Sequence, residues 1–504
     1  MSQDQPAGTP AYGNFVDGAW RPALGGRTFE SRDPSSGQLI GRFAASESAD
    51  VDAAVGAAEA AYAGWRATPA PRRGELLYRF GALLAERKED LARAMTREMG
   101  KILAEARGDV QEGIDIAYLM AGEGRRLFGD VVPSELPDKW AMSIREPLGV
   151  AALITPWNFP VAIPCWKMMP ALVAGNCIVL KPASATPHCA VLLMEILEEA
   201  GLPAGVVNLV TGSGSEAGMP LVRHPGVDVV GFTGNGETGR AIALAAAERG
   251  TRLSMELGGK NAIVVLDDAD LDLAVNGIIW SAFGTTGQRC TACSRVIVSV
   301  GVADELVARL VERSDGLRLG WGLEPGVDVG PLIDAAAVEK VERYVAIGLD
   351  EGAVLVRGGR HATDGALADG HFFEATIFDG VEPTSRLAQE EIFGPVLSVI
   401  RVADYGSAMA VARGVPYGLS SSIFTSDVGT AFRAMRDFDT GIVYVNAGTI
   451  GAETHLPFGG TKATGNGQRE AGYAALDTYT EWKAIYVDYS GHLQRAQIDN
   501  QPDG

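Results

Sequence analysis

The stretch VVGFTGNGETG at 229–239 decides the fold class. A short apolar run leads directly into glycines, and a helical pattern then continues to residue 249. Gly234, Gly236 and Gly239 form a G-x-G-x-x-G turn between the predicted strand and helix, the arrangement that points helix N–H groups at the pyrophosphate of a dinucleotide. In a chain with 63 glycines, a glycine-rich helix entry without a ligand is an equally good interpretation.

The same alternation of strand and helix extends on both sides of this stretch. Short apolar runs closed by Gly or Pro predict strands at 150–155, 177–180, 206–210, 229–232 and 253–257. Helical stretches separate these strands, at 166–174, 187–200, 215–223 and 239–249. A second series has strands at 262–266, 294–300, 396–402, 421–424 and 441–446, and helices at 303–316 and 336–350. Such alternation is typical of parallel sheets, so we predict an α/β fold with two doubly wound parallel-sheet domains.

Two regions of the chain lie outside this alternation. Helical periodicity at 48–65, 72–99 and 101–128 predicts that the first 130 residues are mainly helical. The segments 129–150 and 474–489 are rich in Trp, Tyr and β-branched residues and fit neither domain. We expect these two segments to pair as an additional sheet.

The composition predicts a globular protein of the cytoplasm. The 504 residues are 47% hydrophobic and 21% charged, which excludes disorder over most of the chain. A formal net charge of −20 repels phosphate backbones and anionic lipids, so neither nucleic acid nor a membrane is an expected partner. No apolar run approaches the roughly 20 residues of a membrane-spanning helix, and the polar residues 1–10 lack the pattern of a secretory signal. Five cysteines, an odd and sparse number, suit a reducing compartment.

The candidate nucleophile is Cys290, in the sequence GQRCTAC at 287–293. The guanidinium of the preceding Arg289 and an expected helix start nearby both favour a thiolate. Cys290 and Cys293 also form a C-x-x-C, but zinc needs four ligands and the sequence has no second C-x-x-C or His pair, so we expect no metal. A cysteine that only packs in the core and a reversible Cys290–Cys293 disulfide remain alternatives.

Two further polar groups follow predicted strands. Glu256, in MELGGKN at 255–261, precedes two glycines that permit close backbone approach. In an apolar pocket its carboxyl group would act as a base near neutral pH; alternatively it holds a ribose, since it lies 17 residues after Gly239. Asn158, in PWNFP at 156–160, is either a donor to a developing oxyanion or a turn residue.

Together, seven motifs in order along about 15–489 resemble the aldehyde dehydrogenase superfamily. They are PWNFP (156–160), KPA (181–183), GFTG with a glycine five residues later (231–239), MELGGKN (255–261), GQRC (287–290), EEIFGPV (390–396) and PFGGTKATGNG (457–467). This resemblance implies a Rossmann-like dinucleotide-binding domain at 1–128 and 151–257 and a catalytic domain at 258–473. It also implies an oligomerisation arm at 129–150 and 474–491, with a tail at 492–504.

The resemblance implies roles for single residues. Cys290 would be the nucleophile, Glu256 the general base, and Asn158 with the Cys290 N–H the oxyanion hole. Glu470 matches a carboxylate that is linked to water near the base. The implied cofactor is NAD or NADP, and the residues that match its binding site are Thr155, Trp157, Lys181, Ser184, Gly212, Gly234, Asn235, Leu257, Glu391 and Phe393.

Two of these positions depart from the usual family pattern. Asn235 stands where members usually carry a serine whose hydroxyl reaches a phosphate oxygen. Ser184 stands where many NAD-preferring members carry a glutamate that repels a 2′-phosphate. We therefore expect NADP to be tolerated or preferred.

The expected substrate is a carboxylated semialdehyde. Glu112, Arg289, Gly451 and Ala452 resemble the branch that oxidises 2-aminoadipate 6-semialdehyde, where they would hold the amino and carboxylate ends. Arg289 is a fixed cation for an anionic tail, or it only braces its loop. GQRCTA also occurs in dehydrogenases for 2-oxoglutarate semialdehyde, so that substrate and broad specificity are the alternatives.

Two alternatives lie outside the aldehyde dehydrogenases: a cofactor-independent thiol esterase and a non-catalytic binding protein. Among aldehyde dehydrogenases, Glu256 favours release of the acid by water over transfer to coenzyme A. The match to the family's intersubunit arm implies a homodimer or homotetramer.

Overall fold

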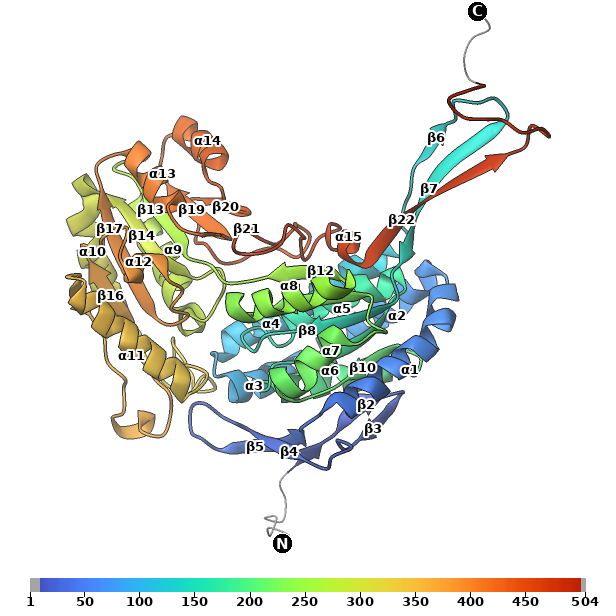
Figure 1. The fold of residues 1–504 in the computed structure, drawn as a ribbon. Helices are drawn as coiled ribbons and strands as arrows, with labels where there is room; N and C mark the ends of the chain where they lie inside the picture. The colour runs from blue at the N-terminus through green and yellow to red at the C-terminus, as the bar shows by residue number, and fades with distance from the viewer. Residues whose placement is uncertain (1–9, 500–504) are drawn as a thin grey trace, which may run out of the picture.

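The computed structural model describes residues 10–499 and folds them into two α/β lobes and a projecting arm (Figure 1). Each lobe is built on a seven-stranded sheet, and the predicted α/β class is confirmed. Residues 1–9, where the sequence lacks a secretory pattern, and 500–504, the end of the expected tail, lie outside the described residues. Within residues 10–499, no helix is long and apolar enough to cross a membrane.

The first sheet holds the G-x-G-x-x-G stretch near one edge, in the order β12-β11-β8-β9-β10-β2-β3. Its strands are β12 (Arg252–Glu256), β11 (Val229–Thr233), β8 (Val150–Ile154), β9 (Cys177–Lys181), β10 (Val207–Leu209), β2 (Asn14–Val16) and β3 (Ala19–Arg21). The first five are parallel, and the last two are antiparallel additions. The helices between the parallel strands are α5 (Ala162–Ala174), α6 (Pro187–Ala200), α7 (Met219–Arg223) and α8 (Gly236–Arg249). The carboxyl ends of the parallel strands therefore meet at one edge, where open α/β sheets bind ligands.

The second sheet has the order β15-β16-β17-β14-β13-β19-β20, and all its pairings are parallel except β15 with β16. The strands are β15 (Val354–Arg357), β16 (Thr376–Asp379), β17 (Val396–Val402), β14 (Cys293–Ser299), β13 (Asn261–Val265), β19 (Ser420–Phe424) and β20 (Ile442–Val445). The helices of this lobe are α9 (Leu271–Phe283), α10 (Val300–Asp315), α11 (Ala335–Asp350), α12 (Arg386–Gln389), α13 (Tyr405–Arg413) and α14 (Val428–Asp437). Separate buried apolar clusters lie on the two sides of this sheet.

The predicted additional sheet is present as a three-stranded arm. It contains β6 (Val131–Pro133), β7 (Lys139–Pro147) and β22 (Thr480–Asp488), in the order β22-β7-β6. The pairing of β7 with β22 is antiparallel and runs from Thr480 opposite Pro147 to Asp488 opposite Lys139. Figure 1 shows this arm extending away from both lobes, with β22 entering it directly after α15 (Ala475–Tyr479).

The prediction of a mainly helical start is wrong for residues 11–44. These residues form β1 (Ala11–Tyr12), β2, β3, β4 (Thr28–Arg32) and β5 (Leu39–Ala44) before the first helix begins. The strands are short and several are half-exposed, so their alternation is weaker than the helical periodicity that follows. The four helices after them are α1 (Ser48–Ala67), α2 (Ala70–Glu86), α3 (Lys88–Met99) and α4 (Leu103–Glu123). The single helix predicted at 72–99 is thus two helices, which meet at Arg87, where φ is −94° and ψ is 11°.

Residues 458–470 return from the second lobe to the first and contact the chain beside Glu256. The Leu257 N–H donates to the Thr464 carbonyl oxygen at 2.7 Å, and the Thr464 hydroxyl donates to the Gly258 carbonyl oxygen at 3.0 Å. Glu256 itself forms an isolated antiparallel bridge with Gly465. This returning segment therefore fixes the end of β12 where the candidate base lies.

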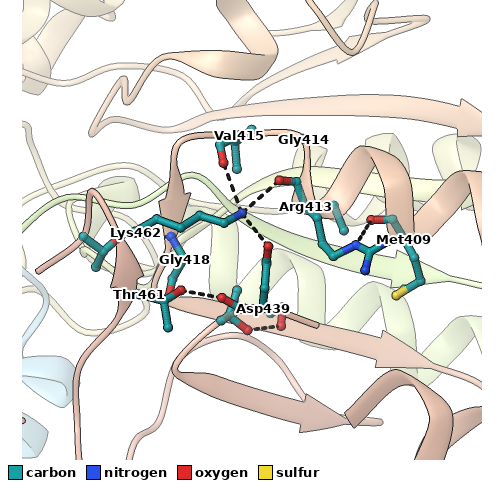
Figure 2. Close-up of polar contacts among 12 residues, drawn as sticks. Met409, Arg413, Gly414, Val415, Gly418, Asp439, Thr461 and Lys462 are labelled. Atoms are coloured by element: carbon teal, nitrogen blue, oxygen red, sulfur yellow. Dashed lines mark hydrogen bonds and ion pairs between the residues drawn. The ribbon is translucent and has the colours of Figure 1, made fainter. Parts of the chain in front are cut away.

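Lys462, in β21 (Thr461–Lys462), anchors the returning segment to the second lobe (Figure 2). Its Nζ donates to the carbonyl oxygens of Arg413 and Val415, at 2.9 and 3.3 Å, and lies 2.6 Å from a carboxylate oxygen of Asp439. Arg413 is the last residue of α13, so the ammonium group satisfies carbonyl groups that have no partner within the helix.

Candidate active site

A pocket with about 560 Å³ of empty space, partly open to solvent, brings together residues from both lobes. Its lining contains most of the predicted chemical and substrate-binding residues. These are Glu112, Glu256, Arg289, Cys290, Gly451, Ala452 and Glu470, and the predicted cofactor residue Leu257 lies beside them. Phe159, Ile163, Trp166, Thr291 and Phe458 supply much of the remaining wall, with Thr233. The pocket is therefore apolar over much of its surface, with charged groups at a few points.

The loop that carries Cys290 is held from two sides. It follows a 3-10 turn (Gly284–Gly287) in which Thr285 and Thr286 have φ values of 53° and 59°, a region that is strained for a threonine. The Asn261 amide donates to the Cys290 carbonyl oxygen at 2.7 Å and to the Ala292 carbonyl oxygen at 2.9 Å. Cys290 lies in a turn, so the expected helix start beside it is wrong.

The resting thiol of Cys290 is neutral, contrary to our expectation of a thiolate. Burial, with smaller contributions from the charges of Glu256 and Glu391, raises its pKa to about 12. Arg289 does not offset these effects, because its guanidinium is directed at Thr285, by a 2.8 Å bond from Nε, and at Glu105, 3.4 Å from Nη2. The nucleophile must therefore lose its proton to a base during the reaction.

Glu256 is the carboxyl group available to take that proton. It ends β12 and is buried, and among residues 10–499 neither of its side-chain oxygens has a hydrogen-bond partner of good geometry. Burial raises its pKa well above the usual range, and the Glu470 charge adds to this effect, while Lys167 and Arg469 oppose it. A side chain at Gly459 would come within 2.4 Å of Glu256 Oε1, so this glycine provides the space for the carboxyl group.

Lys167 is a charged residue of the site that the sequence patterns did not single out. It lies in α5 and is buried, and its ammonium group pairs with Glu470 Oε1. The same oxygen accepts a bond from the Thr233 hydroxyl at 3.3 Å. The signal in the sequence was a single charge within the otherwise apolar helix AIPCWKMMPALVA.

Asn158 lies close to the nucleophile loop. Its side chain is buried, and Nδ2 donates to the Gln288 carbonyl oxygen at 3.0 Å, two residues before Cys290. Gln288 is itself held, because its Oε1 accepts from the Ile333 N–H at 2.9 Å. The amide is thus fixed beside the loop that carries the thiol, where an oxyanion donor is needed.

The predicted substrate-binding residues line the same pocket. Arg289 has an 11% exposed side chain and lies with its guanidinium 5.3 Å from the ring centres of Phe159 and Trp280. Burial raises the pKa of Glu112 to about 8, an effect that Asp109 strengthens and Arg289 weakens. The raised pKa favours the uncharged carboxylic acid form of Glu112 beside the permanent cation of Arg289.

Three predicted cofactor residues gather at the ends of β9 and β10. The Ser184 hydroxyl donates to the Gly212 carbonyl oxygen at 2.8 Å. Lys181 is buried, its Nζ donates to the Pro182 carbonyl oxygen at 2.9 Å, and burial lowers its pKa to about 8. Gly212 has φ 145°, within the range that favours glycine.

The G-x-G-x-x-G stretch connects β11 to α8, as predicted. Asn235 is the N-cap of α8, and its side-chain oxygen accepts from the Thr238 N–H at 2.8 Å. The oxygen of this amide is therefore committed to the helix, and its NH2 group is the part that can meet a phosphate. At the end of β8, the Thr155 hydroxyl is buried and lacks a partner among the described residues.

The remaining predicted cofactor residues come from opposite lobes. Glu391 Oε1 accepts from the Gly259 N–H at 2.9 Å. Trp157 and Phe393 meet edge to face, with ring centres 5.6 Å apart, and Phe393 has a φ of 61°. A side chain at Gly258 would come within 2.2 Å of Glu391 Oε2, which explains why a glycine follows Leu257 so closely after the strand.

Cys293 is the first residue of β14. In residues 10–499, no group of three or more His, Cys, Asp or Glu side chains is arranged to hold a metal ion. Cys290 and Cys293 are both free, and the Cys293 sulfur is buried 3.4 Å from the Arg295 carbonyl oxygen. Burial raises the Cys293 pKa to about 12, which disfavours the reactive thiolate form.

Comparison with known proteins extends this description. The alpha-ketoglutaric semialdehyde dehydrogenase of Bacillus subtilis (strain 168) is 42% identical over 477 residues, which cover 94% of this chain and 98% of that enzyme. The alpha-ketoglutarate semialdehyde dehydrogenase of Haloferax volcanii is 44% identical over 480 residues, which cover 94% and 99%. A crystal structure of betaine aldehyde dehydrogenase from Staphylococcus aureus in complex with NAD+ superposes with a TM-score of 0.93 at 33% identity, covering 96% of this chain and 95% of that one. The model of the aldehyde dehydrogenase family matches residues 20–485, and with these relatives it shows that the chain belongs to that family.

Proposed function

We propose that the protein oxidises a carboxylated semialdehyde, 2-oxoglutarate semialdehyde, to 2-oxoglutarate, with NAD or NADP as the oxidant. The observation that carries this proposal is the placement of Arg289 and Glu112 in the pocket that contains Cys290. The names of the two relatives described above support this substrate over 2-aminoadipate 6-semialdehyde.

The charge state of Glu112 also supports the 2-oxo acid. As a carboxylic acid, Glu112 can donate a hydrogen bond to a 2-oxo or carboxylate oxygen while Arg289 binds the carboxylate. The ammonium group of 2-aminoadipate 6-semialdehyde would instead require Glu112 to ionise, which its raised pKa disfavours. An uncharged acid beside a cation therefore fits an anionic tail with an additional acceptor oxygen.

A dinucleotide fits the residues at the carboxyl ends of the first sheet. The Thr155 hydroxyl and the N-terminus of α8 supply polar groups without partners among the described residues. The buried ammonium group of Lys181 and the half-buried carboxyl group of Glu391 are available to ribose hydroxyls. Ser184 presents no charge that would repel a 2′-phosphate. When bound, the nicotinamide supplies an acceptor for the hydride of the aldehyde.

The first chemical step is formation of a carbon–sulfur bond. The ionised form of Glu256, whose raised pKa makes it a stronger base, takes the proton of the Cys290 thiol. The sulfur bonds to the aldehyde carbon, and the aldehyde oxygen becomes an alkoxide. One N–H of the Asn158 side chain donates to the Gln288 carbonyl oxygen. The other N–H of that amide and the backbone N–H of Cys290 both donate to the alkoxide oxygen. A well-placed donor of this kind is worth about 3 kcal/mol in the transition state. Departure of the hydride then leaves a thioester on Cys290.

The second step is hydrolysis of that thioester. Glu256 must first release the thiol proton, and Glu470, paired with Lys167 and bonded to Thr233, is the polar group placed to carry it away. Glu256 then takes a proton from water, and the hydroxide oxygen adds to the thioester carbon. The carbon–sulfur bond breaks, the carboxylic acid leaves, and the sulfur regains a proton.

The division of labour between the lobes and the assembly are also proposals. The first lobe, with the arm set apart from it, would bind the dinucleotide, and the second would supply Cys290. The arm exposes Trp140, Trp482 and Tyr486, aromatic side chains that support its use as an interface in a homodimer or homotetramer.

A substrate panel tests this function. Reduced cofactor is measured with NAD and with NADP, using 2-oxoglutarate semialdehyde, 2-aminoadipate 6-semialdehyde and propanal. We expect 2-oxoglutarate semialdehyde to have the highest kcat/KM, and Arg289→Ala to raise its KM by roughly 10- to 100-fold, as loss of a charge-assisted contact would. Propanal is the internal control, because it has no carboxylate to lose. A preference for propanal in the wild type, or equal losses for both aldehydes in Arg289→Ala, would contradict the proposal.

A further inference from the structure

Lys101 and Asp109 form an ion pair in the interior of the first lobe. Lys101 lies two residues before α4, and Asp109 lies within that helix. Lys101 Nζ is 2.9 Å from Asp109 Oδ2, and both side chains are 0% exposed. Neither residue lines the pocket around Cys290.

This pair holds both ends of the segment that carries Asn158. Lys101 Nζ donates to the Asn158 carbonyl oxygen at 2.6 Å and lies 3.9 Å from the centre of the Phe159 ring. Asp109 Oδ1 accepts from the N–H of Ala162, the first residue of α5, at 2.7 Å. The cation thus fixes the backbone of Asn158, and the anion fixes the point at which the following helix begins.

Stability alone is a weak reason for such a pair. Two charges lose their hydration when they are buried, and apolar residues of similar volume are often at least as stabilising. A role in positioning gives a better reason, because the side chain of Asn158 lies beside the Cys290 loop, 3.0 Å from the Gln288 carbonyl oxygen. A shift of the Asn158 backbone would move its amide relative to the reacting carbon, and a misplacement of about 1 Å can cost about 100-fold in rate.

We propose that Lys101 and Asp109 are positioning residues, which hold the Asn158 amide where the negative charge develops on the substrate oxygen. The inference rests on the proposed function, in which Asn158 donates to that oxygen. The oxyanion donor is thus supported from behind by residues before and within α4, which bond the backbone at Asn158 and at the start of α5.

The test measures acylation of Cys290 by 4-nitrophenyl acetate without cofactor. The sulfur bonds to the acetyl carbon, the carbon–oxygen bond to the nitrophenyl group breaks, and release of 4-nitrophenolate is followed through the first turnover. The carbonyl oxygen becomes charged as it does in an aldehyde, but no particular aldehyde tail is required. The result is therefore independent of which aldehyde the enzyme oxidises.

The variants form a double-mutant cycle. Asn158→Ala removes the amide, Lys101→Met removes the cation at similar volume, and the double variant combines them. Asp109→Asn keeps an oxygen acceptor for the Ala162 N–H and removes the charge. It therefore tests the effect of the ion pair on acylation if Lys101→Met does not fold. Lys88→Met is the matched control. Lys88, the first residue of α3, donates to the Gln111 side chain of α4 at 2.7 Å and lies outside the site.

We expect Asn158→Ala to slow acylation roughly 100-fold. Lys101→Met and Asp109→Asn should each slow it at least tenfold with an unchanged pH profile, and Lys88→Met should not slow it. In the Asn158→Ala background, Lys101→Met should change the rate less than about twofold, because the amide through which it acts is absent.

Other outcomes distinguish a failure of the proposed function from a failure of the positioning role alone. No loss in Asn158→Ala would contradict the proposed function. A loss in Asn158→Ala without one in folded Lys101→Met or Asp109→Asn would overturn the inference alone. The same loss from Lys101→Met with and without Asn158 would also overturn it, because the pair would then act by another route.

Discussion

Glu105 and Glu256 both lie beside the loop that carries Cys290, but only the carboxylate of Glu105 has hydrogen-bond partners there. Glu105 Oε1 accepts from the Thr285 N–H at 2.7 Å and lies 3.4 Å from the guanidinium of Arg289. Both oxygens of Glu256 lack such partners among residues 10–499. A carboxylate whose oxygen accepts from the loop backbone holds the loop in place, whereas one with free lone pairs can accept a proton. The contrast distinguishes the structural part of the site from the reactive part.

The strongest way to break this contrast is to remove the basicity of Glu256. We expect Glu256→Gln to form its first equivalent of reduced cofactor per site more slowly than the wild type, because the amide cannot take the thiol proton. It should then lose steady turnover by roughly 100-fold or more, because the amide cannot deprotonate water either. Rapid mixing measures the two phases separately. For comparison, Glu105→Gln keeps an acceptor for the Thr285 N–H and loses only the charge beside Arg289, so it should lower both phases by the same small factor. Full steady turnover in Glu256→Gln would refute the role of Glu256 as the base for hydrolysis.

A second test concerns the protonation of the thiol. Because the pKa of Cys290 is raised to about 12, the thiol is protonated at neutral pH and the thiolate fraction increases about tenfold for each pH unit below that value. Alkylation by iodoacetamide without cofactor should therefore accelerate continuously from pH 6 to 9. The profile should keep its position in Arg289→Ala, since that guanidinium is directed at Glu105 and Thr285. A plateau near pH 7 would show that the thiolate is stabilised at rest.

The residues that sequence reasoning located lie in short contiguous motifs. Alternation of strands and helices placed five strands of each sheet within a few residues and missed β2, β3, β15 and β16. The motifs GQRC, MELGGKN and PWNFP located Cys290, Glu256 and Asn158. These motifs are informative because turns at strand ends need particular residues at fixed spacing. The neighbouring residues in the sequence therefore indicate where each of these side chains lies in the fold.

The supporting residues and the charge states were not predictable in this way. Lys101 contacts Asn158 across 57 positions of sequence, and Lys167 contacts Glu470 across 303. The thiolate prediction failed for the same reason, since Arg289 is adjacent to Cys290 in sequence but is directed at Glu105. A pKa depends on neighbours in space and on burial, which a one-dimensional pattern does not contain.

The smallest expected effect comes from Lys462, a fully bonded charge that lies away from the reacting atoms. Lys462→Met removes the bonds to Arg413, Val415 and Asp439 that Figure 2 shows, and we expect a loss of about 1 kcal/mol in the free energy of unfolding, since the pair is partly exposed. Lys462 has a φ of 54°, so Lys462→Gly should lose less than Lys462→Met, because glycine adopts this conformation without strain. Urea denaturation measures both variants, and the first-turnover acylation rate measures the chemistry. If Lys462→Met slowed acylation tenfold without loss of stability, the bonded and reactive parts of the site would not be separable, because the returning segment would transmit its anchoring directly to Glu256.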